Sequence, residues 1–202
     1  MNKKLYIQSY CKIANNEVVL NDVVVLKTEL SDDKSFFKSI YNFLNLKYPK
    51  FFKMDGLSKL TYLASELILK DIEIKDRNIA IVFSNSASSL ETDRKYQKSI
   101  NDSASYFPSP SVFVYTLPNI GIGEVSIRHQ LKSENAFFVF EKFNAKFNYF
   151  YESNLMHTKK ATNVLGGWTN LDGQVAEAFV YLLSENGKLE FTIENLNKLY
   201  KK

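Results

Sequence analysis

The spacing of apolar residues divides the chain into alternating strands and helices. Small or apolar side chains alternate with tyrosine and glutamine over residues 5–11, which is typical of a β-strand. Apolar residues recur at helical spacing over residues 36–44 and 55–71, so both segments are expected to be helices with one apolar face. The valine-rich segment 17–26 and the run NIAIVF at 78–83 predict two more strands, the second of them fully buried.

The second half of the chain continues this alternation. Asn186-Gly187 is a strong two-residue turn signal, so the strands on either side of it are expected to form a β-hairpin. Gly121 and Gly123 lower the helix propensity of their segment, which suggests that it packs closely on a neighbour. The expected elements are a charged helix or loop over 88–102, helices over 116–130 and 144–157, strands over 136–141, 162–166, 175–185 and 188–192, and a short last helix capped by Thr192.

Nothing in the sequence separates these elements into different domains. Because no low-complexity linker, charge block or short repeat interrupts them, we expect one α/β domain over residues 1–202. The start, MNKKLYIQSYCKI, lacks the apolar core of a secretory signal, and the longest apolar runs are far shorter than a membrane span. Together with a free cysteine, this favours a cytoplasmic protein that does not enter a membrane.

Composition narrows the chemistry that the chain can carry. Lys and Arg number 26 against 22 Asp and Glu, and a formal charge of +4 is too small to indicate a nucleic-acid partner. One cysteine excludes an internal disulfide and a multi-cysteine metal site, and two histidines leave little for histidine-based chemistry. We therefore expect no metal and no cofactor. The 16 Phe and 12 Tyr indicate a large apolar surface, part of it covered by another protein.

Residues 108–139, PSPSVFVYTLPNIGIGEVSIRHQLKSENAFFV, resemble the N-terminal region of the β-ketoacyl synthases. Asn119 and Gly123 fit the Asn–Gly pair of that family. The run AFFVF at residues 136–140 fits the strand that leads to the family's catalytic cysteine. The stretch ATNVLGGW, with Gly166 and Gly167, is similar to the strand and diglycine that follow the nucleophile helix. The resemblance extends from about residue 3 to about residue 185.

The resemblance implies a fold. Ketosynthases have the thiolase-type architecture, in which two similar α/β halves share a central layer of helices. The chain resembles one such half, so it is expected to be a single β-ketoacyl synthase N-terminal-like domain with a mixed five-stranded sheet packed with helices.

The resemblance also locates the position of the nucleophile. Counting from Asn119 or back from Gly167 places it at Glu141 or Lys142, and neither residue is a cysteine. A carboxylate is a poor replacement for a thiolate in thioester exchange. Cys11 falls in the first expected strand, where core packing is the more common role of a free cysteine. The chain is therefore expected to be non-catalytic.

The strand that precedes this position is expected to be an interface. In the family it lies at the sheet edge and pairs with its mate across the dimer axis, and an exposed edge of this composition would promote aggregation. An interior strand is the alternative. The helix that follows has its apolar stripe at Phe143, Phe147, Phe150, Tyr151 and Leu155, with Lys146, Asn148, Glu152 and Asn154 on other faces. The expected interface residues are Ala136, Phe137, Phe138, Val139 and Phe140.

A second candidate contact is basic. Lys47, Lys50 and Lys53 lie around Pro49 and beside two phenylalanines, and could meet an acidic acyl carrier protein or a phosphate. A solvated surface is the alternative interpretation.

Three functions remain open. The first is a non-catalytic subunit, similar to a chain-length factor, that pairs with a ketosynthase or with itself in fatty-acid, polyketide or aryl polyene-type biosynthesis. The second is a divergent β-ketoacyl-ACP synthase or acyltransferase completed by another chain. The third is a homodimeric module that binds an apolar ligand.

Overall fold

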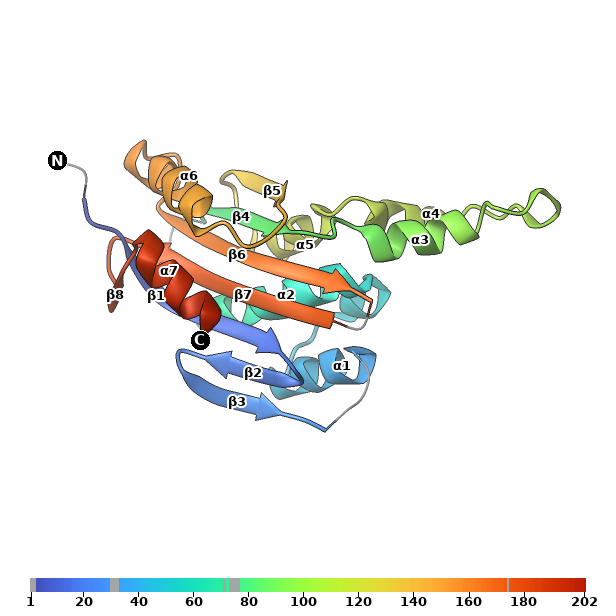
Figure 1. Cartoon of the computed structure of the whole chain (residues 1–202), viewed down its shortest axis with the longest axis horizontal. Helices are drawn as coiled ribbons and strands as arrows, with labels where there is room; N and C mark the ends of the chain where they lie inside the picture. Colours follow the sequence, from blue (N-terminus) through green and yellow to red (C-terminus); the bar gives the residue numbers. More distant parts are fainter. Residues whose placement is uncertain (1–2, 30–32, 71, 73–76, 174) are drawn as a thin grey trace.

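A mixed β-sheet forms the centre of the molecule in the computed structural model (Figure 1). The structure describes residues 3–29, 33–70, 72, 77–173 and 175–202. Within them the strand order is β3-β2-β1-β7-β6-β4-β5, and β8 pairs with β1. The strands are β1 (Tyr6–Ala14), β2 (Glu17–Leu20), β3 (Val23–Lys27), β4 (Ile79–Asn85), β5 (Asn135–Val139), β6 (Asn163–Asp172), β7 (Val175–Ser184) and β8 (Leu189–Glu190).

Helices cover both faces of the sheet. In Figure 1, α6 and α7 lie in front of it, and α1, α2 and α5 lie behind it. None of the helices in the described part of the chain is long and apolar enough to cross a membrane. The helices are α1 (Asp33–Phe43), α2 (Gly56–Leu69), α3 (Leu90–Lys98), α4 (Pro110–Phe113), α5 (Ile120–His129), α6 (Ala145–His157) and α7 (Ile193–Lys201), with 3-10 turns η1 (Pro49–Lys53), η2 (Ser103–Ser105) and η3 (Val114–Thr116).

The strand β7 contributes side chains to two hydrophobic cores, one on each face of the sheet. Alternate side chains of a strand point to opposite faces. Val180 and Leu182 join the core shared with α1, α2 and α5. Phe179, Tyr181 and Leu183 join the core shared with α6 and α7. Residues 178–183 of β7 are therefore apolar at every position, and they lie buried between two helical layers.

The predicted mixed α/β sheet is confirmed, but it has eight strands in the described residues instead of five. The segment 17–26, predicted as one strand, folds into β2 and β3. Asn21 and Asp22 take left-handed φ angles of 48° and 71°, which Asn and Asp tolerate better than most residues, and the chain turns there. The outermost strands β2 and β3 thus extend the sheet beyond β1, β7, β6, β4 and β5.

The predicted hairpin at Asn186-Gly187 is wrong. The strand β7 already pairs with β1 on one side and β6 on the other, so it has no edge left for β8. The strand β8 instead pairs with the start of β1, where Tyr6 lies opposite Glu190. Gly187 is still required, because a Cβ there would lie 2.7 Å from the Cβ of Tyr6.

The two glycines of the predicted helix 116–130 differ. Its helical part is shorter than expected and begins at Ile120. A Cβ on Gly121 would lie 3.1–3.2 Å from Ser58 and Thr61 of α2, so the expected close packing is found there. A Cβ on Gly123 would meet nothing within 4 Å, so close packing does not explain the glycine at this position.

Candidate functional site

The strand β5 lies at one end of the sheet. It pairs in parallel with β4, and in the described part of the chain no strand pairs with its other side. The prediction of an edge strand is therefore confirmed, and the alternative of an interior strand is wrong. Val139 is 54% exposed, and Ala136, Phe137, Phe138 and Phe140 are partly buried. An apolar edge of this kind offers unpaired backbone groups to another strand.

An aromatic surface continues from β5 onto α6. We call it the β5–α6 patch and define it as Phe138, Phe140, Phe147, Phe150 and Tyr151. The ring of Phe147 lies 4.6 Å from that of Phe138, 4.9 Å from that of Phe140 and 5.4 Å from that of Tyr151, measured between centroids. Phe150 is 58% exposed, and an open hollow of about 460 Å³ lies between it and its neighbours on α6. The patch is preformed and faces solvent.

Tyr151 fixes one corner of the patch. Its hydroxyl donates a hydrogen bond to the carboxylate of Glu134, just before β5. Burial, together with this carboxylate, raises the pKa of Tyr151 to about 12, so the phenol stays neutral. The bond ties α6 to the start of the edge strand and holds the aromatic rings in one arrangement.

The predicted nucleophile position lies between β5 and α6. Glu141 and Lys142 are both exposed in the bend that joins the two elements. The helix begins after Asn144, whose side chain accepts a hydrogen bond from the backbone N–H of Phe147 at 3.0 Å. A second open hollow, of about 450 Å³, lies at this bend and reaches Ile193 of α7. Neither exposed side chain is a nucleophile suited to a thioester.

Cys11, the single cysteine of the sequence, is remote from this chemistry. It lies in β1, fully buried, and its Sγ donates to the carbonyl of Ala64 in α2 at 3.3 Å. Burial raises the pKa of its thiol far above the usual range, so it carries almost no thiolate. The position is that of a core residue.

The buried face of α6 differs from the predicted one. Asn148 and Glu152 are buried, whereas Phe150 of the predicted apolar stripe is exposed. The amide of Asn148 donates to the hydroxyl of Tyr181 at 3.0 Å, and that hydroxyl donates to the carboxylate of Glu152 at 2.9 Å. Burial raises the pKa of Glu152 well above its ordinary value. The expectation that Asn148 and Glu152 occupy outward faces is wrong, because β7 supplies polar partners inside the core.

Gly166 and Gly167 lie inside β6, because this strand continues to Asp172 beyond the predicted end at residue 166. A Cβ on Gly166 would overlap the carboxylate of Glu152 and approach the ring of Tyr181 to 2.7 Å. A Cβ on Gly167 would lie 2.6 Å from the carbonyl oxygen of Phe179. Gly166 therefore makes room for the buried polar cluster.

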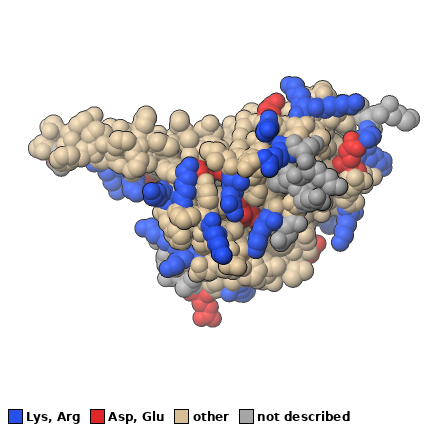
Figure 2. All heavy atoms as spheres, turned by 180° about the vertical axis from the view of Figure 1, so that it is seen from behind, with Lys and Arg blue, Asp and Glu red and all other residues tan. Residues whose placement is uncertain are grey.

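The three lysines of the predicted basic cluster, Lys47, Lys50 and Lys53, differ in their contacts. Lys47 and Lys53 are exposed, but Lys50 pairs with the buried carboxylate of Glu124 at 2.8 Å. This hydrogen bond raises the pKa of Lys50. Figure 2 shows lysine and arginine gathered on the helical face of the molecule. The lysines of residues 34–70 are Lys34, Lys38, Lys47, Lys50, Lys53, Lys59 and Lys70, against Asp55 and Glu66.

Glu66 and His129 form a second buried pair on this side. The Nε2 of His129 lies 2.8 Å from the carboxylate of Glu66, and Arg128 lies 3.8 Å from the same oxygen. Asn119, predicted from the family motif, stands at the start of α5 and makes no side-chain cap. The contact between His129 and Glu66 joins α5 to α2.

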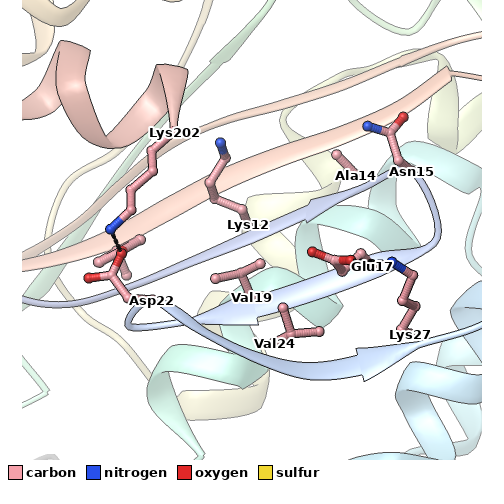
Figure 3. A pocket seen from close by; sticks show the side chains of 10 residues that line it. Lys12, Ala14, Asn15, Glu17, Val19, Asp22, Val24, Lys27 and Lys202 are labelled. Carbon is pink, nitrogen blue, oxygen red and sulfur yellow. Dashed lines mark hydrogen bonds and ion pairs between the residues drawn. The ribbon is translucent and has the colours of Figure 1, made fainter.

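A groove that the sequence did not predict lies where the end of α7 passes over β1, β2 and β3 (Figure 3). Its volume is about 390 Å³. Valines of β2 and β3 line it, together with two ion pairs, Lys27–Glu17 at 3.1 Å and Lys202–Asp22. Lys12 donates to the carbonyl of Tyr200 at 3.0 Å, and burial lowers its pKa. No local pattern announces this groove, because residues 180 positions apart build it.

Metal-binding clusters are not found among the residues that the structure describes: no three His, Cys, Asp or Glu side chains lie close enough to hold an ion.

Comparisons with known proteins identify the fold. No family model and no curated protein matches the chain. A solved structure of the ishigamide ketosynthase/chain length factor has a TM-score of 0.69 and 15% identity, over 90% of this chain and 62% of that chain. The AntDE:AntF complex of a type II polyketide synthase ketosynthase with its acyl-carrier protein has a TM-score of 0.59 and 14% identity, over 98% of this chain and 65% of that one.

One further structure matches in length as well. It is the ketosynthase ApeO in complex with its chain length factor ApeC from Xenorhabdus doucetiae, with a TM-score of 0.59 and 14% identity, over 98% of this chain and 90% of that chain. The chain thus spans less than two thirds of the ishigamide and AntDE:AntF chains, but nearly the whole of this one. The fold is the thiolase-like fold of ketosynthases and chain length factors, as predicted.

Proposed function

We propose that this protein is a non-catalytic subunit of the chain-length-factor type, which pairs through β5 and the β5–α6 patch with a ketosynthase in polyketide or aryl polyene-type biosynthesis. The observation that carries the proposal is the unpaired, apolar edge of β5, continuous with exposed aromatic rings on α6. An exposed apolar edge promotes aggregation unless it is covered, and pairing with another strand satisfies its free backbone groups.

The absence of a suitable nucleophile supports a role without covalent chemistry. In the family that the sequence resembles, acyl transfer from a thioester uses an activated thiolate at the start of a helix. The resemblance assigns that place to Glu141 or Lys142, and Cys11 is buried with its thiol protonated. The chain would then contribute surface to a partner's acyl tunnel instead of reacting with the acyl group.

The size of the chain supports the same role. A chain of similar length and the same fold is part of the ApeO–ApeC complex of a ketosynthase with its chain length factor. Lys47 and Lys53 stay a predicted contact for an acyl carrier protein, whereas Lys50 is already neutralised by Glu124.

The test is co-purification from the native host, with wild type compared with Phe138→Lys. A lysine in the middle of β5 places a charge in the proposed interface, so a ketosynthase should co-purify with wild type and be lost from the variant. Phe52→Lys, which places the same charge on an exposed phenylalanine outside the patch, should retain it. Recovery of equal amounts with all three proteins, or of no ketosynthase with wild type, would contradict the proposal.

A further inference from the structure

The groove of Figure 3 lies over the three strands at the opposite end of the sheet from β5. We call it the β1–β3 groove. Its volume of about 390 Å³ falls within the range of sites that hold small molecules. Because it is separated from β5 by the width of the sheet, the interface proposed above does not account for it.

The register of the strands gives the β1–β3 groove an apolar floor. Lys12 of β1 lies opposite Val19 of β2, and Val19 lies opposite Val24 of β3, so the three residues form one row across the sheet. The next row on the same face contains Glu17 and Lys27. Val24 is 51% exposed. The middle row therefore presents two valine side chains beside one ammonium group.

An ion pair closes each end of this floor. Figure 3 shows Glu17 and Lys27 at one end and Asp22 and Lys202 at the other, with the two valines between them. The nitrogen of Lys27 lies 3.1 Å from the carboxylate of Glu17, and Lys202 pairs with Asp22. Both lysines at the ends are thus neutralised by carboxylates of the groove itself.

Lys12 differs from these two lysines. Its nitrogen donates to the backbone carbonyl of Tyr200 at 3.0 Å, and among the described residues no carboxylate forms an ion pair with it. Glu177 of β7 acts on Lys12 only at longer range, and its carboxylate accepts a hydrogen bond from Nε1 of Trp168 at 3.3 Å. An ammonium group has three donors. Lys12 therefore keeps donors and a positive charge for a ligand.

The charges of the β1–β3 groove select a ligand class. Three lysines and two acidic residues line it, which leaves a single positive charge. One carboxylate would balance this charge and form charge-assisted hydrogen bonds with the ammonium group. A phosphate with two negative charges would leave one of them uncompensated. The valine floor is suited to an apolar group, since covering it removes apolar surface from water.

We propose that the β1–β3 groove binds a small monocarboxylate with an apolar chain. The carboxylate pairs with Lys12, and the chain lies on Val19 and Val24 between the two ion pairs. This site is an addition to the proposed function and does not depend on it.

Calorimetric titration of octanoate into the purified protein tests the recognition of the carboxylate. We expect saturable binding of octanoate, and weaker binding of octan-1-ol, which has the chain but no carboxylate. Lys12→Met keeps the apolar stem and removes the charge, so it should raise the dissociation constant of octanoate about tenfold or more. Lys98→Met, at an exposed lysine of α3, is the control and should leave the dissociation constant unchanged.

Two neighbouring valines of β3 locate the bound chain. Val24→Asp puts a negative charge on the floor of the groove, so it should weaken octanoate binding about tenfold or more. Val23→Asp should not, because Val23 is 61% exposed but points to the opposite face of the strand. Since both valines are exposed, both variants should fold, as circular dichroism can check.

Three results would overturn the inference. They are the absence of saturable octanoate binding by wild type, equal affinity for octanoate and octan-1-ol, and equal dissociation constants for Val23→Asp and Val24→Asp. None of them bears on a ketosynthase partner at β5.

Discussion

Glu152 is the residue whose environment most constrains α6. Its carboxyl group is fully buried, it accepts a hydrogen bond from Tyr181, and burial raises its pKa well above the ordinary value. The hydroxyl of Tyr181 is also buried, and its own pKa is raised by burial and by the carboxylate. The pair therefore favours the protonated carboxyl in the folded state.

This predicts a pH dependence of stability. An acid whose pKa is raised by folding contributes stability that is fully present below its unfolded pKa of about 4.3 and is lost as the pH rises through the folded pKa. The contribution of Glu152 to the free energy of unfolding should therefore fall as the pH rises above about 4.3. Glu152→Gln should flatten that slope and raise the stability at neutral pH, as measured by urea unfolding at several pH values. Glu185→Gln, at an exposed position, is the control, and an unchanged slope in Glu152→Gln would contradict the assignment.

The sequence could not predict this cluster. Helical spacing correctly predicts α6, but it assigns polar residues to the outside, so Asn148 and Glu152 were expected there. Their partner Tyr181 lies on β7, and it follows Glu152 by 29 positions in the chain. Only the packing of α6 on the sheet shows that the hydroxyl of Tyr181 is a polar partner for both residues inside the core.

At the scale of elements, the two glycines of β6 connect the sheet to this cluster. Gly166 pairs with Val82 of β4 and Tyr181 of β7, and its missing Cβ leaves room for Glu152. The resemblance to the ketosynthases pointed to these glycines from the sequence. It placed them at the end of a strand, whereas β6 continues past them to Asp172.

Two alanine substitutions separate packing from backbone effects. Gly166→Ala should destabilise the protein by about 1–3 kcal/mol or more, because the new methyl group overlaps Glu152 and Tyr181 in a filled core. Gly123→Ala should stabilise it by about 0.5–1 kcal/mol, since that position in α5 is open and alanine favours a helix. Thermal and chemical unfolding measure both. Similar effects in the two variants would contradict the packing account.

The order of the elements shows where local patterns succeed and fail. Runs of apolar residues predicted β1, β4, β5 and β7 and the main helices, because the apolar pattern of each element lies within its own segment. Pairing depends on neighbours that are distant in the chain. The chain does bend at Asn186, as the turn signal indicates, but β8 pairs with β1 and not with β7.

At the scale of the whole molecule, several exposed aromatic residues lie along one side, whereas the opposite sheet edge, β3, exposes valines. The β5 edge, the exposed rings on α6 and the segment of residues 99–117 lie along the aromatic side (Figure 1). The helical face carries lysines instead (Figure 2). The excess of aromatic residues in the composition indicated a protein-covered surface, but their location on that side required the fold.

The central claim is that this chain acts by pairing and carries no acyl group itself. Intact-mass spectrometry tests it most directly, on the complex purified from the native host and incubated with an acyl carrier protein that bears an acyl thioester. The account predicts that the acyl mass is added to the ketosynthase partner and that the mass of this chain is unchanged. An acyl adduct on this chain, at any residue, would contradict it.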